Sequence, residues 1–495
     1  MKVLMLNPPF LRRYSRSQRS PAVIKSGTLY YPIWLGYATG VLEEAGHDVR
    51  LIDAPARGYD VEWVKDFVRD FRPDIMVLDS STPSFQSDVR VAAELKAVAP
   101  DAPVVFVGNH VSATAEESLR KGEVIDVIAR EEYDFTLREL VPVLHERGDL
   151  NNVGGISFRR GSEIRHNPRR EYIWDLDKIP WVSKVWKKHL DYRDYFYSIT
   201  QYPEITIVTS RGCPYHCSFC VYPQVMHGHK YRRRSAQDVV NEFCYVEREF
   251  PEVKEIFIED DTFTIDPKWI LDFSQCMVAS GCKLQWTANS RVDLKPNVLQ
   301  AMKRANCRLL CVGFESGNQE ILERMHKGID LEETKSFVRD AQQTGIMVHG
   351  CFMCGNPGET RETFEQTVRL AMEINPDTAQ FFPIMVYPGT ETYNYYKQKG
   401  EIRSENYEDW ITPEGWHNCV VSTPDLSHEE MVRLCDEARD RFYLRRDYVW
   451  SKLKQVLRHP SEFTRVSMAA KNYFLKYMTK RWNQRSHLEP SHPAG

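Results

Sequence analysis

The first 150 residues alternate short apolar runs with segments of helical spacing. We expect strands at residues 3–6, 49–53, 75–79, 104–108 and 124–128. Helical spacing runs through residues 35–45, 61–71, 89–99 and 135–146. Strands that alternate with helices predict a parallel, doubly wound, Rossmann-like sheet whose ligand lies at the carboxyl ends of the strands.

A second alternating series begins after residue 197. Its expected strands are residues 205–209, 255–260, 284–289, 308–315, 347–353 and 378–385. Helices are expected at residues 236–250, 267–279, 297–305, 319–325, 331–345 and 362–374. Six such units predict a partial (β/α)6 barrel, with the functional residues on the loops that follow the strands.

These patterns divide the chain into four segments. We expect an α/β domain over residues 1–150, a linker with a small hairpin over 151–197, the barrel over 198–400 and a helical region over 401–495. Aromatic and basic residues alternate in the last segment, and its basic residues include Lys452, Lys454, Arg458, Lys471, Lys476, Lys480 and Arg481. This pattern is compatible with weak contact to a membrane surface, and an exposed helical cap is the ordinary alternative.

Composition narrows the class of protein. With 42% hydrophobic and 27% charged residues, the 495-residue chain has the make-up of a folded protein rather than a disordered one. Its 65 basic and 69 acidic residues give a net charge of −4, so we expect no nucleic-acid partner. No apolar run approaches the ~18 residues of a membrane span, and the start resembles no signal peptide, so we expect a cytoplasmic protein.

Only one group of cysteines is closely spaced in a predicted loop. Cys213, Cys217 and Cys220 follow the first barrel strand directly. Three thiolates on one loop can hold three irons of a [4Fe–4S] cluster and leave the fourth iron open. The alternative is a zinc loop with His216 as fourth ligand, although structural zinc sites usually take their ligands as two separated pairs.

The C-x3-C-x2-C spacing after a first strand, with Phe219 before the third cysteine, resembles the radical S-adenosylmethionine superfamily. The resemblance implies that the open iron chelates S-adenosylmethionine and that one electron cleaves the sulfonium to a 5′-deoxyadenosyl radical. Residues 259–263 resemble the family's acidic segment, where a carboxylate pairs with the methionine amine. Residues 290–291, 313–317, 355–360 and 387–390 resemble its other cofactor loops. By this resemblance the cofactor-binding residues are Phe219, Glu259, Asp260, Arg291, Glu315, Gly355 and Pro388.

The other cysteines favour packing roles. Cys351 and Cys354 are three residues apart in a predicted strand, so their side chains point to opposite faces and cannot share a metal. Cys311 also lies in a predicted strand. Cys354 remains a candidate catalytic residue because it is close to the predicted mouth of the active site.

The N-terminal domain resembles the cobalamin-binding domain of B12-dependent radical enzymes. Residues 53–58 match the Asp and Gly of the motif Asp-x-His-x-x-Gly, but Pro55 stands where the cobalt-ligating His would be. The resemblance therefore implies cobalamin bound without a histidine ligand, through Asp53, Gly58, Ser80, Ser81, Thr82, Gly108 and Asn109. His110 is either a cobalt ligand or a loop residue with local hydrogen bonds. A nicotinamide cofactor is disfavoured, because Asn7-Pro8-Pro9 replaces a glycine-rich turn.

Together these resemblances imply a cobalamin-dependent radical enzyme. We expect a methyltransferase that acts on an unactivated carbon of a small-molecule or lipid-like substrate, with flavodoxin or ferredoxin as electron donor. One alternative is a non-methylating oxidoreductase or cyclase resembling the anaerobic magnesium-protoporphyrin cyclase, and another is a corrinoid- or cluster-based sensor. We expect the two domains to share one cavity, lined by Asp53 and residues 80–82 on one side and by Glu259, Asp260, Glu315 and Cys354 on the other.

Overall fold

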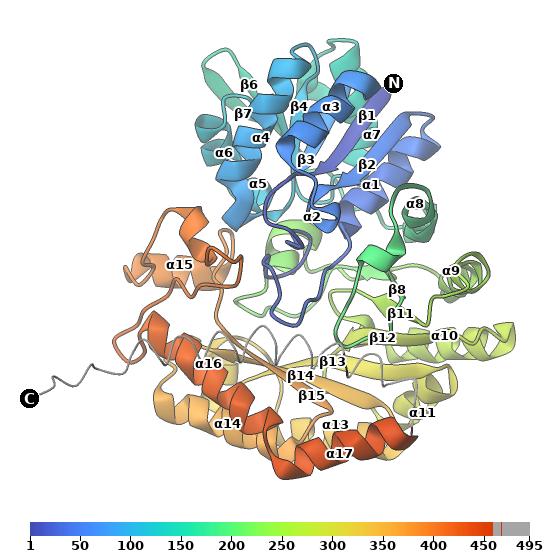
Figure 1. Cartoon of the computed structure of the whole chain (residues 1–495), viewed down its shortest axis with the longest axis vertical. Coiled ribbons are helices and arrows are strands. Elements are labelled where there is room, and N and C mark those ends of the chain that lie inside the picture. Colours follow the sequence, from blue (N-terminus) through green and yellow to red (C-terminus); the bar gives the residue numbers. More distant parts are fainter. Residues whose placement is uncertain (459–466, 468–495) are drawn as a thin grey trace, which may run out of the picture.

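The computed structural model describes residues 1–458 and residue 467. Two sheets lie one above the other, each flanked by helices, and the connection after the first strand descends between them (Figure 1). Among the described residues, no helix combines the length and apolar character that crossing a membrane requires.

The upper sheet has the strand order β2-β1-β3-β4-β5-β6-β7. Its parallel strands are β1 (Lys2–Asn7), β2 (Asp48–Asp53), β3 (Ile75–Asp79), β4 (Val104–Val107) and β5 (Val127–Ala129). The strand order reverses between β1 and β3, so the crevice for a ligand lies at their carboxyl ends. The predicted doubly wound sheet is confirmed.

The helices of this domain cover both faces of the sheet. They are α1 (Ile33–Glu44), α2 (Ala54–Arg57), α3 (Val61–Phe71), α4 (Phe85–Val98), α5 (Asn109–Ala113), α6 (Ala115–Lys121) and α7 (Asp134–His145). Helices α1 and α7 pack together, as do α3 and α4. The apolar residues of β1 alternate between the two sides, with Val3 and Met5 in one core cluster and Leu4 and Leu6 in the other.

Two features differ from the sequence expectation. Strand β5 starts at Val127 rather than at residue 124, because the Asp126 carboxylate accepts a hydrogen bond from the Val104 N–H (2.7 Å) and ends the preceding turn. The hairpin β6 (Ile156–Arg160) and β7 (Glu163–His166) pairs antiparallel with β5, so part of the expected linker extends the first sheet.

The lower sheet is a half-open barrel of six parallel strands. They are β8 (Glu204–Ile207), β11 (Glu255–Ile258), β12 (Gln285–Ser290), β13 (Cys307–Glu315), β14 (Met347–Cys354) and β15 (Thr378–Pro383), in that order across the sheet. The helices between them are α9 (Ala236–Glu249), α10 (Pro267–Ser280), α11 (Pro296–Arg304), α12 (Gln319–Arg324), α13 (Leu331–Thr344) and α14 (Arg361–Ile374). The six predicted strand–helix units are confirmed.

Three further helices follow the barrel: α15 (Glu391–Gln398), α16 (His428–Tyr443) and α17 (Arg446–Arg458). Helix α16 packs on β15 and runs beneath the barrel together with α17 (Figure 1). Lys452 lies 3.4 Å from the Asp377 carboxylate. The predicted basic residues Lys471, Lys476, Lys480 and Arg481 lie outside the described residues.

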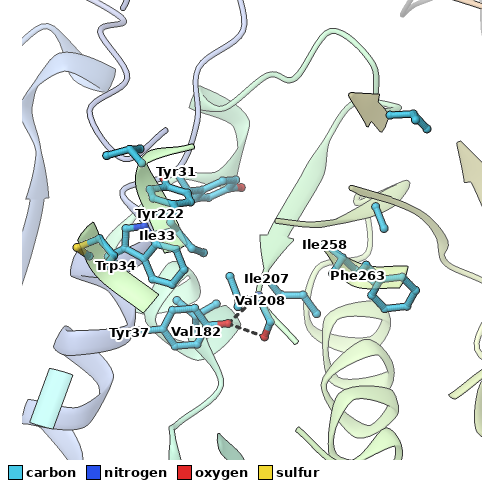
Figure 2. Packing of buried hydrophobic residues seen from close by; sticks show 14 of the residues in the cluster. Tyr31, Ile33, Trp34, Tyr37, Val182, Ile207, Val208, Tyr222, Ile258 and Phe263 are labelled. Carbon is cyan, nitrogen blue, oxygen red and sulfur yellow. Dashed lines mark hydrogen bonds between the residues drawn. The ribbon is translucent and has the colours of Figure 1, made fainter. Parts of the chain in front are cut away.

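Strand β8 is an edge strand of the open barrel, and aromatic side chains cover its free edge. The Tyr37 hydroxyl donates to the Val208 carbonyl (3.0 Å) and accepts from the Val208 N–H (2.8 Å), as the dashed lines in Figure 2 show. The Tyr31 hydroxyl donates to the Glu204 carbonyl (2.9 Å), and the indole of Trp186, in α8 (Val182–His189), donates to Thr206 (3.0 Å). These bonds satisfy backbone groups at a buried edge, where the Val208 carbonyl also accepts a hydrogen bond from Arg234 (3.2 Å).

We predict that Tyr37→Phe destabilises the protein by ~1–3 kcal/mol, because it leaves the buried Val208 N–H without a partner and leaves Arg234 as the remaining donor to the Val208 carbonyl. Denaturant unfolding monitored by tryptophan fluorescence measures the change. Tyr59→Phe is the matched control, since the Tyr59 hydroxyl makes no hydrogen bond within the described part of the chain. Equal stability of Tyr37→Phe and the parent protein would contradict this role of the hydroxyl.

Candidate active site between the two domains

The cysteine loop follows the short strand β9 (Ser210–Arg211), which pairs with β10 (Arg232–Arg233). Asp260 holds its start: the carboxylate accepts hydrogen bonds from the N–H groups of Thr209 (2.6 Å) and Ser210 (3.1 Å) and from both hydroxyls. Gly212 has φ +82°, and a Cβ there would lie 2.3 Å from the Lys230 carbonyl oxygen, so the turn requires glycine. Asp260 therefore positions the loop.

The three cysteines of the loop are free thiols. Cys213 is buried, while Cys217 and Cys220 are half-buried. Burial raises the pKa of Cys213 and of Cys220, and the nearby Arg19 opposes the shift at Cys220. His216, the alternative fourth ligand, is exposed and stacks on His229 with ring centroids 4.1 Å apart. The loop thus offers three soft sulfur donors, which fits an iron–sulfur cluster with one open iron.

A cation from the first domain reaches the acidic segment after β11. Arg19, in the β1–α1 connection, donates to the Glu259 carboxylate (2.6 Å) and to the Asp260 carbonyl (2.9 Å). Burial raises the pKa of Glu259, and Arg19 is the strongest opposing influence. Glu259 therefore forms a cation site next to the cysteine loop, as the family resemblance implies.

Glu315 and Arg291 present unsatisfied polar atoms beside the same loop. Glu315 has φ +64°, and its carboxylate lies 3.0 Å from Lys327 Nζ, while Oε2 is buried without a partner among the described residues. Arg291 lies over the Tyr215 ring at 3.6 Å, and its Nε is buried 3.8 Å from the Asp293 carboxylate, with no hydrogen-bond partner in the described part of the chain. Buried polar groups without partners are rare, so this pair fits a bound polar ligand. Lys327 also lies over the ring of Phe219 (5.8 Å).

Cys354, the last residue of β14, and Gly355, which follows it, lie on the side of the barrel that helix α16 covers. Cys354 is fully buried and makes a side-chain contact with Cys435 of α16. A Cβ at Gly355 would lie 2.5 Å from Met431 Sδ, also in α16. Both residues thus pack against α16, and the packing alternative considered for Cys354 is the one that the geometry supports.

A small pocket lies between the domains. From the first domain it is lined by Arg16, Ser17, Arg19, Ser80, Ser81, Thr82, Gly108 and Asn109, and from the barrel by Val221, Met226, Tyr387 and Pro388. Gly108 has φ +110°, and a Cβ there would meet the Ser80 carbonyl oxygen at 2.4 Å. Asn109 Oδ1 is buried without a partner in the described chain. A polar cradle at the carboxyl ends of β3 and β4 fits cobalamin, the cofactor that the resemblance implies.

Asp53 and Gly58 shape the loop after β2 and do not line this pocket. The Asp53 carboxylate accepts hydrogen bonds from Asn7 (2.7 Å) and from the Tyr195 hydroxyl (2.8 Å) and caps α2, which Gly58 closes in a left-handed conformation. Burial raises the pKa of Asp53 to about 6. In this chain the Asp and Gly of the Asp-x-His-x-x-Gly motif therefore fix the conformation of the loop after β2.

His110 is a packed residue of the short helix α5. Its Nδ1 lies 3.2 Å from the Thr82 hydroxyl, and its ring contacts Phe85 and Tyr407. Burial lowers its pKa to about 3. These contacts match the local hydrogen-bonding alternative.

Sequence reasoning missed the network beneath the pocket. Arg16 and Asp88 form a fully buried ion pair (2.6 Å), and the Asp88 carboxylate also accepts hydrogen bonds from Ser80 (2.9 Å) and Ser84 (2.6 Å). The sequence feature that could have pointed to this network is the arginine-rich segment after β1, residues 11–20. The sequence alone does not show which of its arginines is buried.

Comparisons with known proteins agree with this arrangement. The radical SAM superfamily matches residues 207–371, and the B12-binding domain matches residues 19–141. A protein named as an uncharacterized methyltransferase in Pyrococcus horikoshii is 31% identical, over 90% of this chain and 93% of its own length. The anaerobic magnesium-protoporphyrin IX monomethyl ester cyclase of Cereibacter sphaeroides is 28% identical, over 85% of this chain and 68% of its own. The solved radical S-adenosylmethionine methyltransferase TsrM of Kitasatospora setae has the same fold, with a TM-score of 0.68 and 18% identity over 88% of this chain and 89% of that one.

Anaerobically reconstituted protein should contain about four irons and four sulfides per chain. We predict that Cys213→Ala, Cys217→Ala and Cys220→Ala each lose the cluster and with it all cleavage of S-adenosylmethionine, as measured by iron analysis and deoxyadenosine formation. Cys276→Ala, which removes a half-buried thiol from α10, is the control and should keep both. Deoxyadenosine from a variant lacking all three loop cysteines would contradict the assignment.

Proposed function

The chain belongs to the radical SAM enzymes that carry a B12-binding domain, and on this premise we propose that it methylates an unactivated carbon of a small-molecule or lipid-like substrate. Its cofactors are a [4Fe–4S] cluster, S-adenosylmethionine and cobalamin. When bound, the cluster supplies the electron that cleaves S-adenosylmethionine, and cobalamin supplies the methyl group.

The observation that carries the proposal is a wall shared by the two cofactor sites. Val221 follows Cys220 directly and lines the interdomain pocket opposite Ser80 and Gly108. Arg19 lines the same pocket and pairs with Glu259. Methyl transfer needs reacting atoms within about 3–3.5 Å of each other, so both cofactors must open onto one cavity.

The residues divide into ligands and supports. We assign Cys213, Cys217 and Cys220 to the cluster. Phe219, Glu259, Arg291, Glu315 and Pro388 are assigned to S-adenosylmethionine, and Ser80, Ser81, Thr82, Gly108 and Asn109 to cobalamin. Asp260, Gly355, Asp53 and Gly58 support the loops that carry these ligands, because their own side chains or conformations are used in local bonds and packing.

The cyclase-like alternative rests on the relative of Cereibacter sphaeroides, which aligns with 85% of this chain. In this alternative reaction, the cofactor-binding residues assigned above keep their roles, but no methyl group is transferred to a product. The sensor alternative is excluded, since the family is enzymatic.

The reaction also needs a reductant, and we propose that a cytoplasmic flavodoxin or ferredoxin provides it. The tip of the cysteine loop supports this, because Pro214 and His216 are exposed and bring the cluster loop to the surface.

For the C-terminal region we propose weak contact with a membrane surface. Three large apolar side chains that are at least half exposed support it: Leu444, Trp450 and Leu457.

Holoprotein incubated anaerobically with S-adenosylmethionine and a reductant should form S-adenosylhomocysteine in addition to deoxyadenosine. We predict that cobalamin-free protein loses the S-adenosylhomocysteine and keeps the deoxyadenosine. Chromatography of both nucleosides measures this. Deoxyadenosine alone from protein loaded with cobalamin would favour the cyclase-like alternative and contradict methyl transfer.

We also predict that bound cobalamin has no histidine ligand from the protein. Because Pro55 has no ligating side chain and His110 is held by Thr82, bound cob(II)alamin should show no nitrogen hyperfine coupling from a protein imidazole in its electron paramagnetic resonance spectrum. His110→Ala should leave that spectrum unchanged. Imidazole coupling that disappears in His110→Ala would overturn the assignment.

A further inference from the structure

Three side chains on neighbouring barrel strands converge outside the cysteine loop. Potential ligand atoms of Cys311 in β13 and of His349 and Cys351 in β14 all lie within 4.8 Å of one another. No residue of this trio takes part in the cluster, S-adenosylmethionine or cobalamin sites assigned above.

The strand register brings them together. Cys311 lies directly opposite His349, and Cys351 is two residues further along β14, so all three side chains share one face of the sheet. Thr378 on β15 lies opposite His349, and its hydroxyl is 2.7 Å from His349 Nδ1. A histidine that ligates a metal usually has its ring held in this way by a hydrogen bond.

The distance between the two thiols suits a shared ion. Cys311 Sγ and Cys351 Sγ are 3.9 Å apart. Two thiolates bound tetrahedrally to one zinc ion, each at ~2.3 Å, lie about 3.8 Å apart. In a [4Fe–4S] cluster each thiolate instead takes its own iron, which spreads the thiolates over the cluster and away from a single point.

A disulfide fits the register poorly. Strands spaced ~4.8 Å apart with a rise of ~3.3 Å per residue place Cα atoms two positions out of register about 8 Å apart. A disulfide requires Cα atoms within ~7 Å, so joining Cys311 to Cys351 would displace the strands. The pair is better suited to bridging through an ion than to direct oxidation.

The trio faces the inside of the barrel on the side of the cysteine loop. Lys327 interacts electrostatically with Cys217 of that loop and with Cys351, and Glu315 also acts on Cys351. The half-buried Tyr30 and Tyr197 also interact electrostatically with Cys311. Cys311 and Cys351 are half-buried, whereas His349 is buried.

We propose that Cys311, His349 and Cys351 bind one zinc ion, separate from the [4Fe–4S] cluster, inside the barrel. Two thiolates and a neutral imidazole balance the charge of Zn²⁺, and binding releases the two thiol protons to solvent. Three protein ligands leave the fourth tetrahedral position open, as in catalytic rather than structural zinc sites.

The test is metal analysis of the full-length protein, reconstituted anaerobically with its cluster, supplied with zinc chloride and freed of loosely bound metal by gel filtration. We expect about one zinc per chain beside about four irons. Cys311→Ala and Cys351→Ala should each lower bound zinc at least tenfold and leave the iron content unchanged, which also shows that the variants fold. Cys307→Ala, which removes a buried thiol from the same strand β13, is the matched control and should keep its zinc.

Zinc-edge X-ray absorption of the parent protein supplies an independent readout. We expect two sulfur neighbours at ~2.3 Å and nitrogen or oxygen neighbours at ~2.0–2.1 Å. The variant that lacks all three loop cysteines should keep its zinc, so the result does not depend on S-adenosylmethionine cleavage. Holoprotein without zinc, zinc unaffected by Cys311→Ala and Cys351→Ala, or a shell of three or more sulfurs would overturn the proposal.

Discussion

The free edge of β8 is the constraint on which the arrangement of the two domains depends. A six-stranded parallel sheet that does not close leaves backbone groups of its first strand unpaired, and in this chain they are buried. Ile207 bonds to β11, so Thr206 and Val208 face the other way and need partners from outside the sheet. Trp186 and Tyr37 provide them, and each combines an apolar ring that packs between the domains with one polar group that bonds to the backbone. Figure 2 shows the bonds of Tyr37 to Val208. Edge closure and domain docking are therefore the same interaction.

Docking at this edge sets how the two proposed cofactor sites lie relative to each other. Helix α1 packs on α8, which packs on β8, and its Tyr37 bonds to Val208 at the edge of β8. The β1–α1 connection before it crosses between the sheets, and Arg19 reaches the acidic segment beside the cysteine loop. Earlier in the same connection, Arg16 turns back into the first domain and pairs with Asp88 below the pocket. A buried ion pair repays its desolvation only when further hydrogen bonds satisfy it, and Asn7, Ser80 and Ser84 supply these. One connection thus links the floor of the pocket proposed for cobalamin to the acidic segment proposed for S-adenosylmethionine.

Periodicity was enough to predict both sheets, because each strand is a short apolar run and each helix has a regular buried face. The spacing of Cys213, Cys217 and Cys220 allowed a prediction of the cluster ligands from sequence, since a loop ligand set is local in sequence. Contacts that depend on strand register could not be predicted in this way. Cys311 and Cys351 are forty residues apart, and only the pairing of β13 with β14 brings them together.

The two cysteines of β14 show the same limit. Alternation correctly places Cys351 and Cys354 on opposite faces, but it does not by itself say which face lines the barrel. Neighbouring residues carry that information: Val348 and Phe352 share the face of Cys354 and are fully buried, whereas His349 shares the face of Cys351. Helix α16 covers the face that carries Cys354, so Cys354 packs against Cys435 of that helix. Cys351, on the opposite face, points to the inside of the barrel.

The chemistry of a radical enzyme restricts which side chains can line the inner face of the barrel sheet. A thiol S–H bond is weak, and its hydrogen is readily taken by a carbon radical, so free thiols inside the barrel would intercept the radical before the substrate did. Cys311 and Cys351 lie on the side of the barrel where Lys327 contacts the cysteine loop. Coordination to zinc replaces both S–H bonds by S–Zn bonds and leaves no hydrogen to abstract. The proposed ion would therefore protect the radical reaction in addition to offering an open coordination position, which explains why two cysteines can occupy a place where unprotected thiols would be a liability.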